Sequence, residues 1–192
     1  MNILLIAATN NEIQIHPSET CKILISGVGI LNTAYSLTRE LCFRDYDLVI
    51  NMGVAGSFNE ELTNGDVVEV VEENLSEIGY EDKNKFFEFS EFNIKTRFFV
   101  EGRTKLIKVK SITVNKVHGN EISITNIQDR LNPDIESMEG AAVFKVCQEF
   151  NIPCMQIRAI SNQVKERNKL DWNLPLAIDN LNIEVKNIID SL

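Results

Sequence analysis

A glutamate stands directly after the first apolar run of the chain. Residues 2–8 (NILLIAA) are followed by the polar segment 9–12 (TNNE), which ends in Glu12. A carboxylate at the mouth of a strand, partly removed from water, could act as a general base. Glu12 could equally be a solvated surface side chain, and this segment alone does not separate the two interpretations.

Two glycine segments follow the next two apolar runs. Residues 27–29 (GVG) come after 22–26, and residues 53–56 (GVAG) come after 47–51. The first has two glycines of the pattern G-x-G-x-x-G and no clear acidic residue about 20 positions on, which argues against a dinucleotide site. The second, which begins at Gly53, would bring backbone N–H groups close to a ligand or would form an ordinary turn.

Two polar segments in the second half of the chain are stronger candidates. Residues 136–142 (ESMEGAA) run from a predicted strand into a helix, and residues 158–162 (RAISN) leave the following strand. A glutamate at a helix N-terminus, here Glu139, usually interacts with the helix dipole and contributes about 0.3–1 kcal/mol. Arg158 could be a structural ion-pair partner. It is the combination of these segments with Glu12 that indicates a site.

The elements that must position these residues follow from the apolar pattern. Buried strands are predicted over residues 2–8, 22–26, 47–51, 66–72, 110–115 and 154–160. Helices are predicted over residues 30–43, 121–131, 139–150 and 174–192. This alternation predicts a single α/β domain over residues 1–192, with ligands bound at the carboxyl ends of the strands.

The segment 76–110 departs from this alternation and predicts an extended loop or a hairpin. It holds eight of the 19 basic residues and six phenylalanines between Phe86 and Phe99. Either core packing or an interface with a second chain would account for the phenylalanines.

Composition narrows the class of ligand. The 192 residues carry a formal net charge of −9, which argues against a nucleic-acid partner and favours a small molecule. Four cysteines without C-x-x-C spacing are typical of buried thiols in a reducing compartment, and we expect a cytoplasmic protein without a signal peptide or membrane span. Only His16 and His118 are available, so a histidine-rich metal site is not expected.

The order of these motifs resembles the nucleoside phosphorylase and nucleosidase superfamily. The resemblance rests on Glu12, the Gly-x-Gly turn, residues 51–56 (NMGVAG), residues 137–140 (SMEG) and residues 158–162 (RAISN), and it covers most of the chain. Within the superfamily, residues 78–82 (IGYED), 113–115 (TVN), 136–142, and 160–162 through Arg167 to Trp172 are most similar to futalosine hydrolases of the alternative menaquinone pathway. The resemblance implies a three-layer α/β/α sandwich with a mixed central sheet.

The resemblance also assigns roles to residues. Glu12 matches the carboxylate that polarises the attacking water, and Met138 and Glu139 match residues that pack beneath the ribose and bind its hydroxyls. A transition state with oxocarbenium character gains from such anions, and a carboxylate can accept both hydroxyl protons. Arg158 could orient Glu12.

Three positions depart from the adenine-specific nucleosidases. Asn162 replaces an aspartate, and its amide can donate toward O6 and N7 of a 6-oxopurine, where an ionised aspartate would repel O6. Val54 replaces a serine near the water. Val117, beside His118, falls where an aromatic residue usually stacks on the base.

Water is preferred over phosphate as the nucleophile. Phosphorylases bind their anionic nucleophile with cations, commonly arginines near the first strand. Here no arginine occurs before Arg39, and a carboxylate, Glu12, follows that strand. Glu12 would repel phosphate, which favours hydrolysis.

The resemblance implies a homodimeric N-ribosyl hydrolase that needs neither cofactor nor metal and releases hypoxanthine from futalosine. Two alternatives remain open, namely a methylthioadenosine/S-adenosylhomocysteine or aminodeoxyfutalosine nucleosidase, and a non-catalytic purine-nucleoside sensor. Futalosine carries a carboxylate, so a basic residue of segment 76–110 is expected to meet it. The candidates are Lys83, Lys85, Lys95, Arg97, Arg103, Lys105, Lys108 and Lys110.

Overall fold

Strands and helices alternate along the chain as the apolar pattern predicts. The computed structural model describes residues 1–83, 85–89, 91–166 and 168–192, so Arg167 lies outside the described residues. The strands are β1 (Ile3–Ala7), β2 (Cys21–Ile25), β3 (Leu48–Ser57), β4 (Val67–Leu75), β5 (Gly79–Asp82), β6 (Lys85–Glu88), β7 (Arg97–Phe99), β8 (Ile107–Thr113), β9 (Ile135–Ser137) and β10 (Cys154–Gln163). The helices are α1 (Ile30–Phe43), α2 (Glu121–Leu131), α3 (Gly140–Phe150) and α4 (Leu174–Ser191), with the 3₁₀ turns η1 (Asn10–Glu12) and η2 (Lys169–Asp171).

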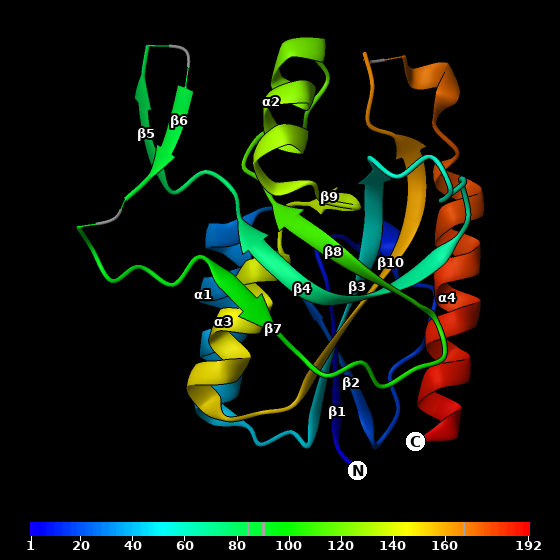
Figure 1. Ribbon diagram of the computed structural model, residues 1–192. Coiled ribbons are helices and arrows are strands. Elements are labelled where there is room, and N and C mark those ends of the chain that lie inside the picture. Colours follow the sequence, from blue (N-terminus) through cyan, green and yellow to red (C-terminus); the bar gives the residue numbers. More distant parts are fainter. Residues whose placement is uncertain (84, 90, 167) are drawn as a thin grey trace.

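Eight of the strands form one mixed sheet at the centre of the molecule (Figure 1). Parallel pairs join β2 to β1, β1 to β3 and β3 to β10, whereas β10 and β4 are antiparallel. Because β10 pairs with both β3 and β4, the strands β10, β4, β8, β9 and β3 close into a ring. The carboxyl ends of β1, β3 and β10 therefore meet at one edge, opposite the chain termini in Figure 1.

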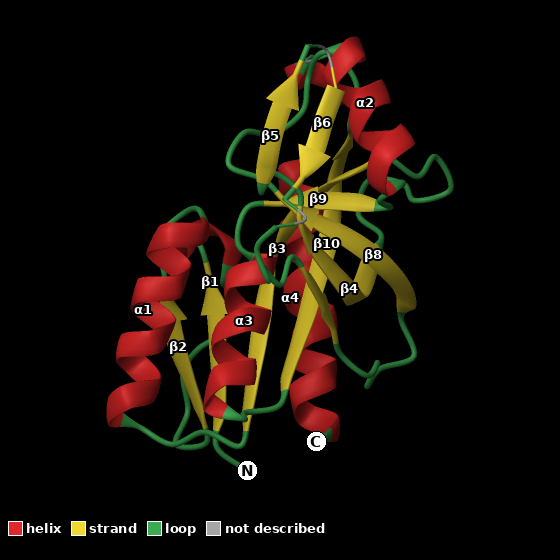
Figure 2. Cartoon of the chain, turned by 60° about the vertical axis from the view of Figure 1, so that its left-hand side comes forward, coloured by secondary structure: helices red, strands yellow, loops and turns green. Residues whose placement is uncertain are grey.

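Helices cover both faces of the parallel strands, which confirms the predicted three-layer α/β/α fold (Figure 2). Leu37 of α1 and Phe144 of α3 belong to one buried apolar cluster with the sheet. Leu181 and Val185 of α4 belong to a second cluster on the other face. None of the described helices is both long enough and apolar enough to cross a membrane.

Helix ends lie where local chemistry requires them. Helix α2 begins after Asn120, whose side chain accepts hydrogen bonds from Ile122 N and Ser123 N. It ends at Asn132, which adopts a left-handed conformation with φ of 44°. Gly29 precedes α1 with φ of 93°, a backbone conformation that favours glycine.

Two strands are longer than their apolar runs predict. The expected loop at residues 53–56 is wrong, because β3 continues to Ser57 with Gly53 and Val54 paired to Arg158 and Ala159 of β10. Strand β10 likewise continues through Asn162 instead of ending at Ile160. Small and polar residues remain in these strands because the sheet ladder satisfies their backbone groups.

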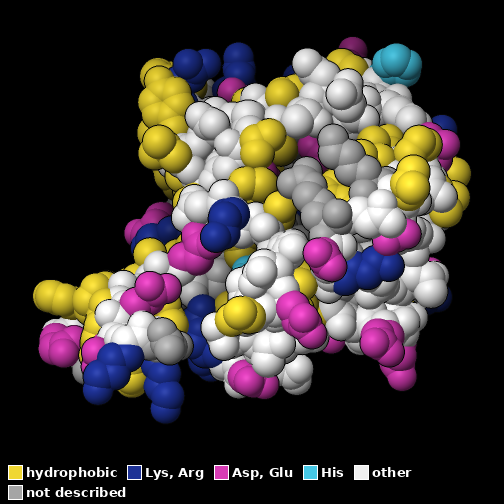
Figure 3. Space-filling model, turned by 90° about the horizontal axis from the view of Figure 1, so that it is seen from above, with side chains coloured by type: hydrophobic (Ala, Val, Ile, Leu, Met, Phe, Trp, Pro, Cys, Tyr) yellow, Lys and Arg dark blue, Asp and Glu magenta, His cyan; other side chains and the backbone are white. Residues whose placement is uncertain are grey.

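The first part of the basic, Phe-rich segment 76–110 forms the hairpin of β5 and β6, which projects from the body beside α2 (Figure 2). The rest contributes β7 and the start of β8 to the main sheet. The Arg130 guanidinium of α2 lies 4.1 Å from the Phe86 ring centre and donates a 2.5 Å hydrogen bond to the carbonyl of Ser76. Viewed from above, the hairpin carries hydrophobic, basic and acidic side chains at one corner of the molecule (Figure 3).

A buried polar network links the strands beneath α3. Glu73 of β4 is fully buried and accepts hydrogen bonds from Gln156 Nε2 at 2.7 Å and Thr113 Oγ1 at 2.8 Å. Gln156 in turn accepts a 3.1 Å hydrogen bond from Asn51 Nδ2. Burial raises the pKa of Glu73 to about 7, although these hydrogen bonds and the charge of Arg158 oppose the shift.

Replacement of this carboxyl group should change the pH dependence of stability. The folded protein retains the Glu73 proton up to about pH 7, whereas the unfolded chain loses it near 4.5, so wild-type stability falls as pH rises through that window. Glu73→Gln abolishes this fall. The free energy of unfolding is measured in urea for both proteins. We expect the difference between the two values to change by on the order of 3 kcal/mol from pH 4 to pH 8. A pH-independent difference would contradict the prediction.

Candidate active site

Glu12 is buried at the carboxyl end of β1. The residue is 9% exposed, which rules out the alternative of a solvated surface glutamate. Oε2 accepts hydrogen bonds of 3.0 Å from both the backbone N and Oγ1 of Thr9, and Oε1 accepts one of 3.2 Å from Val54 N. The backbone carbonyl of Glu12 is held by Asn182 Nδ2 of α4 at 3.0 Å. The carboxylate is therefore fixed by Thr9 and Val54, and the backbone of Glu12 by α4.

Gly53 provides room for the side chains of Glu12 and Arg158, which both lie over it. A Cβ atom at this position would lie 2.2 Å from Arg158 Nη1 and 2.9 Å from Glu12 Oε1. Any larger residue would displace one of these charged groups. The glycine that looked like part of a turn is instead a strand residue required for close approach.

Arg158 is buried beside the carboxylate of Glu139. Its side chain is 1% exposed, and Nη2 lies 3.8 Å from Glu139 Oε2, a distance for charge attraction and too long for a hydrogen bond. Glu139, in the N-cap position of α3, uses Oε1 to accept a 3.0 Å hydrogen bond from Gly29 N. Within the described part of the chain, Arg158 Nε and Nη2 have no hydrogen-bond partner. Two donors of this buried guanidinium are therefore unused.

Beyond Gly56, the same edge holds a cavity of about 350 Å³. Asn162 and Val117 both line it, and Val117 is 38% exposed. A strand rises about 3.3 Å per residue, so Gly53 and Gly56 are about 10 Å apart along β3. Two neighbouring groups result, one around Glu12, Arg158 and Glu139 and one around Asn162. Met138 packs instead against the small apolar cluster that includes Phe58 and Val114.

The amide of Asn162 is already oriented. Its Oδ1 accepts a 2.8 Å hydrogen bond from Ser161 Oγ, and its Nδ2 donates a 3.0 Å hydrogen bond to the Gln163 carbonyl. One N–H of the amide is therefore committed to the backbone. The other is left for a bound ligand.

The pairing of an acid with a base in this cavity was not predicted from the sequence. Glu136 and His118 both line it, and Oε2 of Glu136 lies 2.5 Å from Nδ1 of His118. Trp172 of the adjoining loop lines it as well. A glutamate inside an apolar strand, flanked by Ile135, was the available signal, but its partner comes from a loop 18 residues away.

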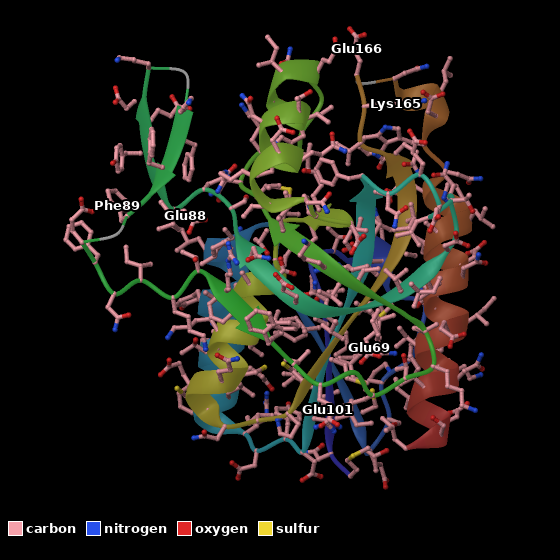
Figure 4. The ribbon with its side chains drawn as sticks, viewed as in Figure 1. Glu69, Glu88, Phe89, Glu101, Lys165 and Glu166 are labelled. Carbon is pink, nitrogen blue, oxygen red and sulfur yellow. The ribbon has the colours of Figure 1, made fainter. Side chains whose placement is uncertain are left out.

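The basic residues of the cavity differ from those expected. Among the described residues, Lys116 and Lys165 line it, and none of the eight basic residues of segment 76–110 does. Lys165 lies on the loop after β10 at the site edge, whereas Glu69, the 2.9 Å ion-pair partner of Lys108, lies toward the opposite end (Figure 4). Lys165 itself pairs with Asp171 at 2.9 Å.

Comparisons with known proteins place this chain among relatives that act on nucleosides. Residues 111–190 match the family model described as Phosphorylase superfamily. The related curated proteins are nucleosidases, which confirms the prediction of an enzyme that hydrolyses N-ribosyl bonds.

The similar curated proteins carry the names of two different nucleosidases. A 5′-methylthioadenosine/S-adenosylhomocysteine nucleosidase of Shewanella sp. is 28% identical over 79% of this chain and 71% of its own length. An aminodeoxyfutalosine nucleosidase of Campylobacter jejuni is 24% identical over 77% of this chain and 70% of its own length.

Solved structures share the fold. A 5′-methylthioadenosine/S-adenosylhomocysteine nucleosidase of Neisseria meningitidis, in complex with methylthio-immucillin-A, superposes with a TM-score of 0.80 at 20% identity, covering 100% of this chain and 99% of that one. A futalosine hydrolase of Helicobacter pylori gives 0.83 at 17% identity, covering 100% and 98%. These likenesses concern the fold.

Proposed function

We propose that this protein hydrolyses the N-glycosidic bond of futalosine and releases hypoxanthine and dehypoxanthine futalosine, as a step of menaquinone biosynthesis. The observation that carries hydrolysis is the buried carboxylate of Glu12, fixed by Thr9 and Val54 beside the Arg158 guanidinium. It supplies a base for water at the carboxyl end of β1.

The charges around Glu12 suit a sugar that becomes cationic. Glu12 and Glu139 place two carboxylates at one end of the site, and in our proposal Glu139 accepts hydrogen bonds from the ribose hydroxyls. Met138 packs beneath the ribose. As the bond to the base breaks, positive charge grows on the sugar and these anions stabilise it. The same anions would repel a phosphate nucleophile, which supports water instead.

The base end supports a 6-oxopurine. Asn162 lines the cavity with one free amide N–H, which can donate to O6 or N7 of hypoxanthine. Gly53 and Gly56 place this amide and the Glu12 carboxylate along one strand. Val117 contributes an apolar contact to the base, and Arg158 orients the carboxylates.

Two alternatives have support of their own. The names of the relatives favour a methylthioadenosine/S-adenosylhomocysteine or aminodeoxyfutalosine nucleosidase, both of which act on 6-aminopurines. A purine-nucleoside sensor without turnover would use the same pocket. Incubation with each nucleoside, followed by chromatography of the free base, separates the three.

Glu12→Gln should abolish most turnover while leaving the fold intact. The amide keeps the size of the side chain but cannot accept a proton from water, so we expect kcat to fall by about 10²- to 10⁴-fold. The control is Glu19→Gln at an exposed position, which should be unchanged. Circular dichroism checks folding. Unchanged turnover by a folded Glu12→Gln protein would contradict the proposed mechanism.

Asn162→Asp should move preference from 6-oxo toward 6-amino purines. An aspartate accepts from a 6-amino group and repels O6, so the ratio of kcat/KM for futalosine to that for aminodeoxyfutalosine should fall. Asn168→Asp adds the same charge to the same cavity and serves as the control. If the ratio does not move, or moves equally in the control, Asn162 does not read the base.

We also propose a homodimer of single-domain chains formed through the projecting hairpin. Tyr80 and Phe87 of the hairpin and Phe92 of the loop after it are 45%, 41% and 61% exposed, whereas Phe98 alone among the six phenylalanines is fully buried. Light scattering should give about twice 21.8 kDa for the wild type and the monomer mass for Phe87→Glu/Phe92→Glu. A monomeric wild type would exclude this interface.

A further inference from the structure

The pair Glu136 and His118 has no task in the mechanism above, although it lines the cavity. Glu136 is 4% exposed and the His118 side chain is 12% exposed. Glu136 Oε1 accepts a 3.0 Å hydrogen bond from His118 N, and its Oε2 lies 2.5 Å from His118 Nδ1. One carboxylate therefore binds both the backbone and the ring of the same histidine.

The pair lies next to Asn162. Both residues lie over Gly56, since a Cβ atom added to this glycine would be 3.4 Å from Asn162 Nδ2 and 3.6 Å from Glu136 Cγ. The His118 ring also packs edge-on against Phe58, with ring centres 5.9 Å apart. The imidazole is thus held from two sides within the base-binding end of the site.

The leaving base requires a proton, which Asn162 cannot supply. When the bond between C1′ and N9 breaks, its electron pair moves onto the purine, which must gain a proton to leave as a neutral base. An amide is a hydrogen-bond donor but does not give up a proton near neutral pH, and one N–H of Asn162 is already bound to the Gln163 carbonyl. A second group must supply the proton.

We propose that His118 is the general acid that protonates the departing purine, and that Glu136 is the residue that positions it. This inference rests on the proposed nucleoside hydrolysis. Because the ionised Glu136 carboxylate is only an acceptor, it fixes a proton on Nδ1 and directs Nε2 of the imidazolium to the ligand. The carboxylate also balances the positive charge of that form.

The atoms balance in the step. The C1′–N9 bond breaks, the purine takes the Nε2 proton at N7, and water bonded to C1′ loses a proton to Glu12. His118 regains its proton from solvent, and Glu12 releases one. The charged residues that share the cavity with the imidazole are Glu136, Lys116, Lys165, Glu166 and Asp171.

A substrate that needs no acid provides the test. A purine nucleoside methylated at N7 carries a positive base that departs without protonation. His118→Gln keeps a donor for Glu136 but cannot transfer a proton. We expect its kcat for the ordinary nucleoside to fall about 10²- to 10⁴-fold with little change in KM. Its kcat for the N7-methylated analogue should fall no more than a few-fold.

Three further variants complete the comparison. Glu136→Gln should show the same dependence on the leaving group, more weakly, because the ring loses its orienting charge. His118→Gln/Glu136→Gln leaves no unpaired buried carboxylate and provides a folded protein if the single variant fails to fold. His16→Gln alters the other histidine of the chain, which is exposed, and should behave as wild type. Equal losses on both substrates, or no loss on the ordinary one, would overturn the proposal.

The identity of the substrate is tested separately by the wild type. If the wild type cleaves methylthioadenosine but not futalosine, the futalosine proposal fails, and the His118 test is run on methylthioadenosine and its N7-methyl analogue. If the wild type cleaves no nucleoside in either form, both proposals fail. Cleavage of futalosine with no leaving-group effect in His118→Gln rejects only the proposed acid.

Discussion

The buried guanidinium of Arg158 is the constraint on which the site depends. A single buried cation would cost several kcal/mol without compensating charge. Here Glu139 lies 3.8 Å from Nη2, Glu12 Oε1 and Arg158 Nη1 both lie over Gly53, and the charge of Arg158 opposes the rise in the pKa of Glu73. These carboxylates come from β4, η1 and the start of α3. One positive charge therefore holds together elements that are far apart in sequence.

This constraint explains the composition of the strands around it. Arg158 needs space above β3, and only a glycine at position 53 provides it. Beneath α3, Gly140 allows Glu73 and Gln156 to approach the helix backbone, since a Cβ there would lie 2.1 Å from Glu73 Oε2. The closure of β10 onto both β3 and β4 brings these two close approaches side by side. The two glycines thus leave the space in which these charged and polar side chains pack.

Local signals predicted the helices well and the strand ends poorly. Helix α2 has the predicted bounds because Asn120 and Asn132 cap it through short-range contacts. The ends of β3 and β10 were missed because the small and polar residues there are held by pairing across the sheet, which no local pattern records. The contact of His118 with Glu136 was missed for the same reason. It depends on β9 lying between β3 and β8.

Several of the acidic residues of the chain are buried around the carboxyl edge of the sheet. Five glutamates are buried among the described residues: Glu12, Glu69, Glu73, Glu136 and Glu139. Two of them flank the proposed ribose position, where cleavage creates positive charge, while the base end offers donors from Asn162 and His118 to a purine that gains electrons. Both sets of groups are held by the sheet before substrate binds, so in our proposal they stabilise bond cleavage without reorganisation of the protein.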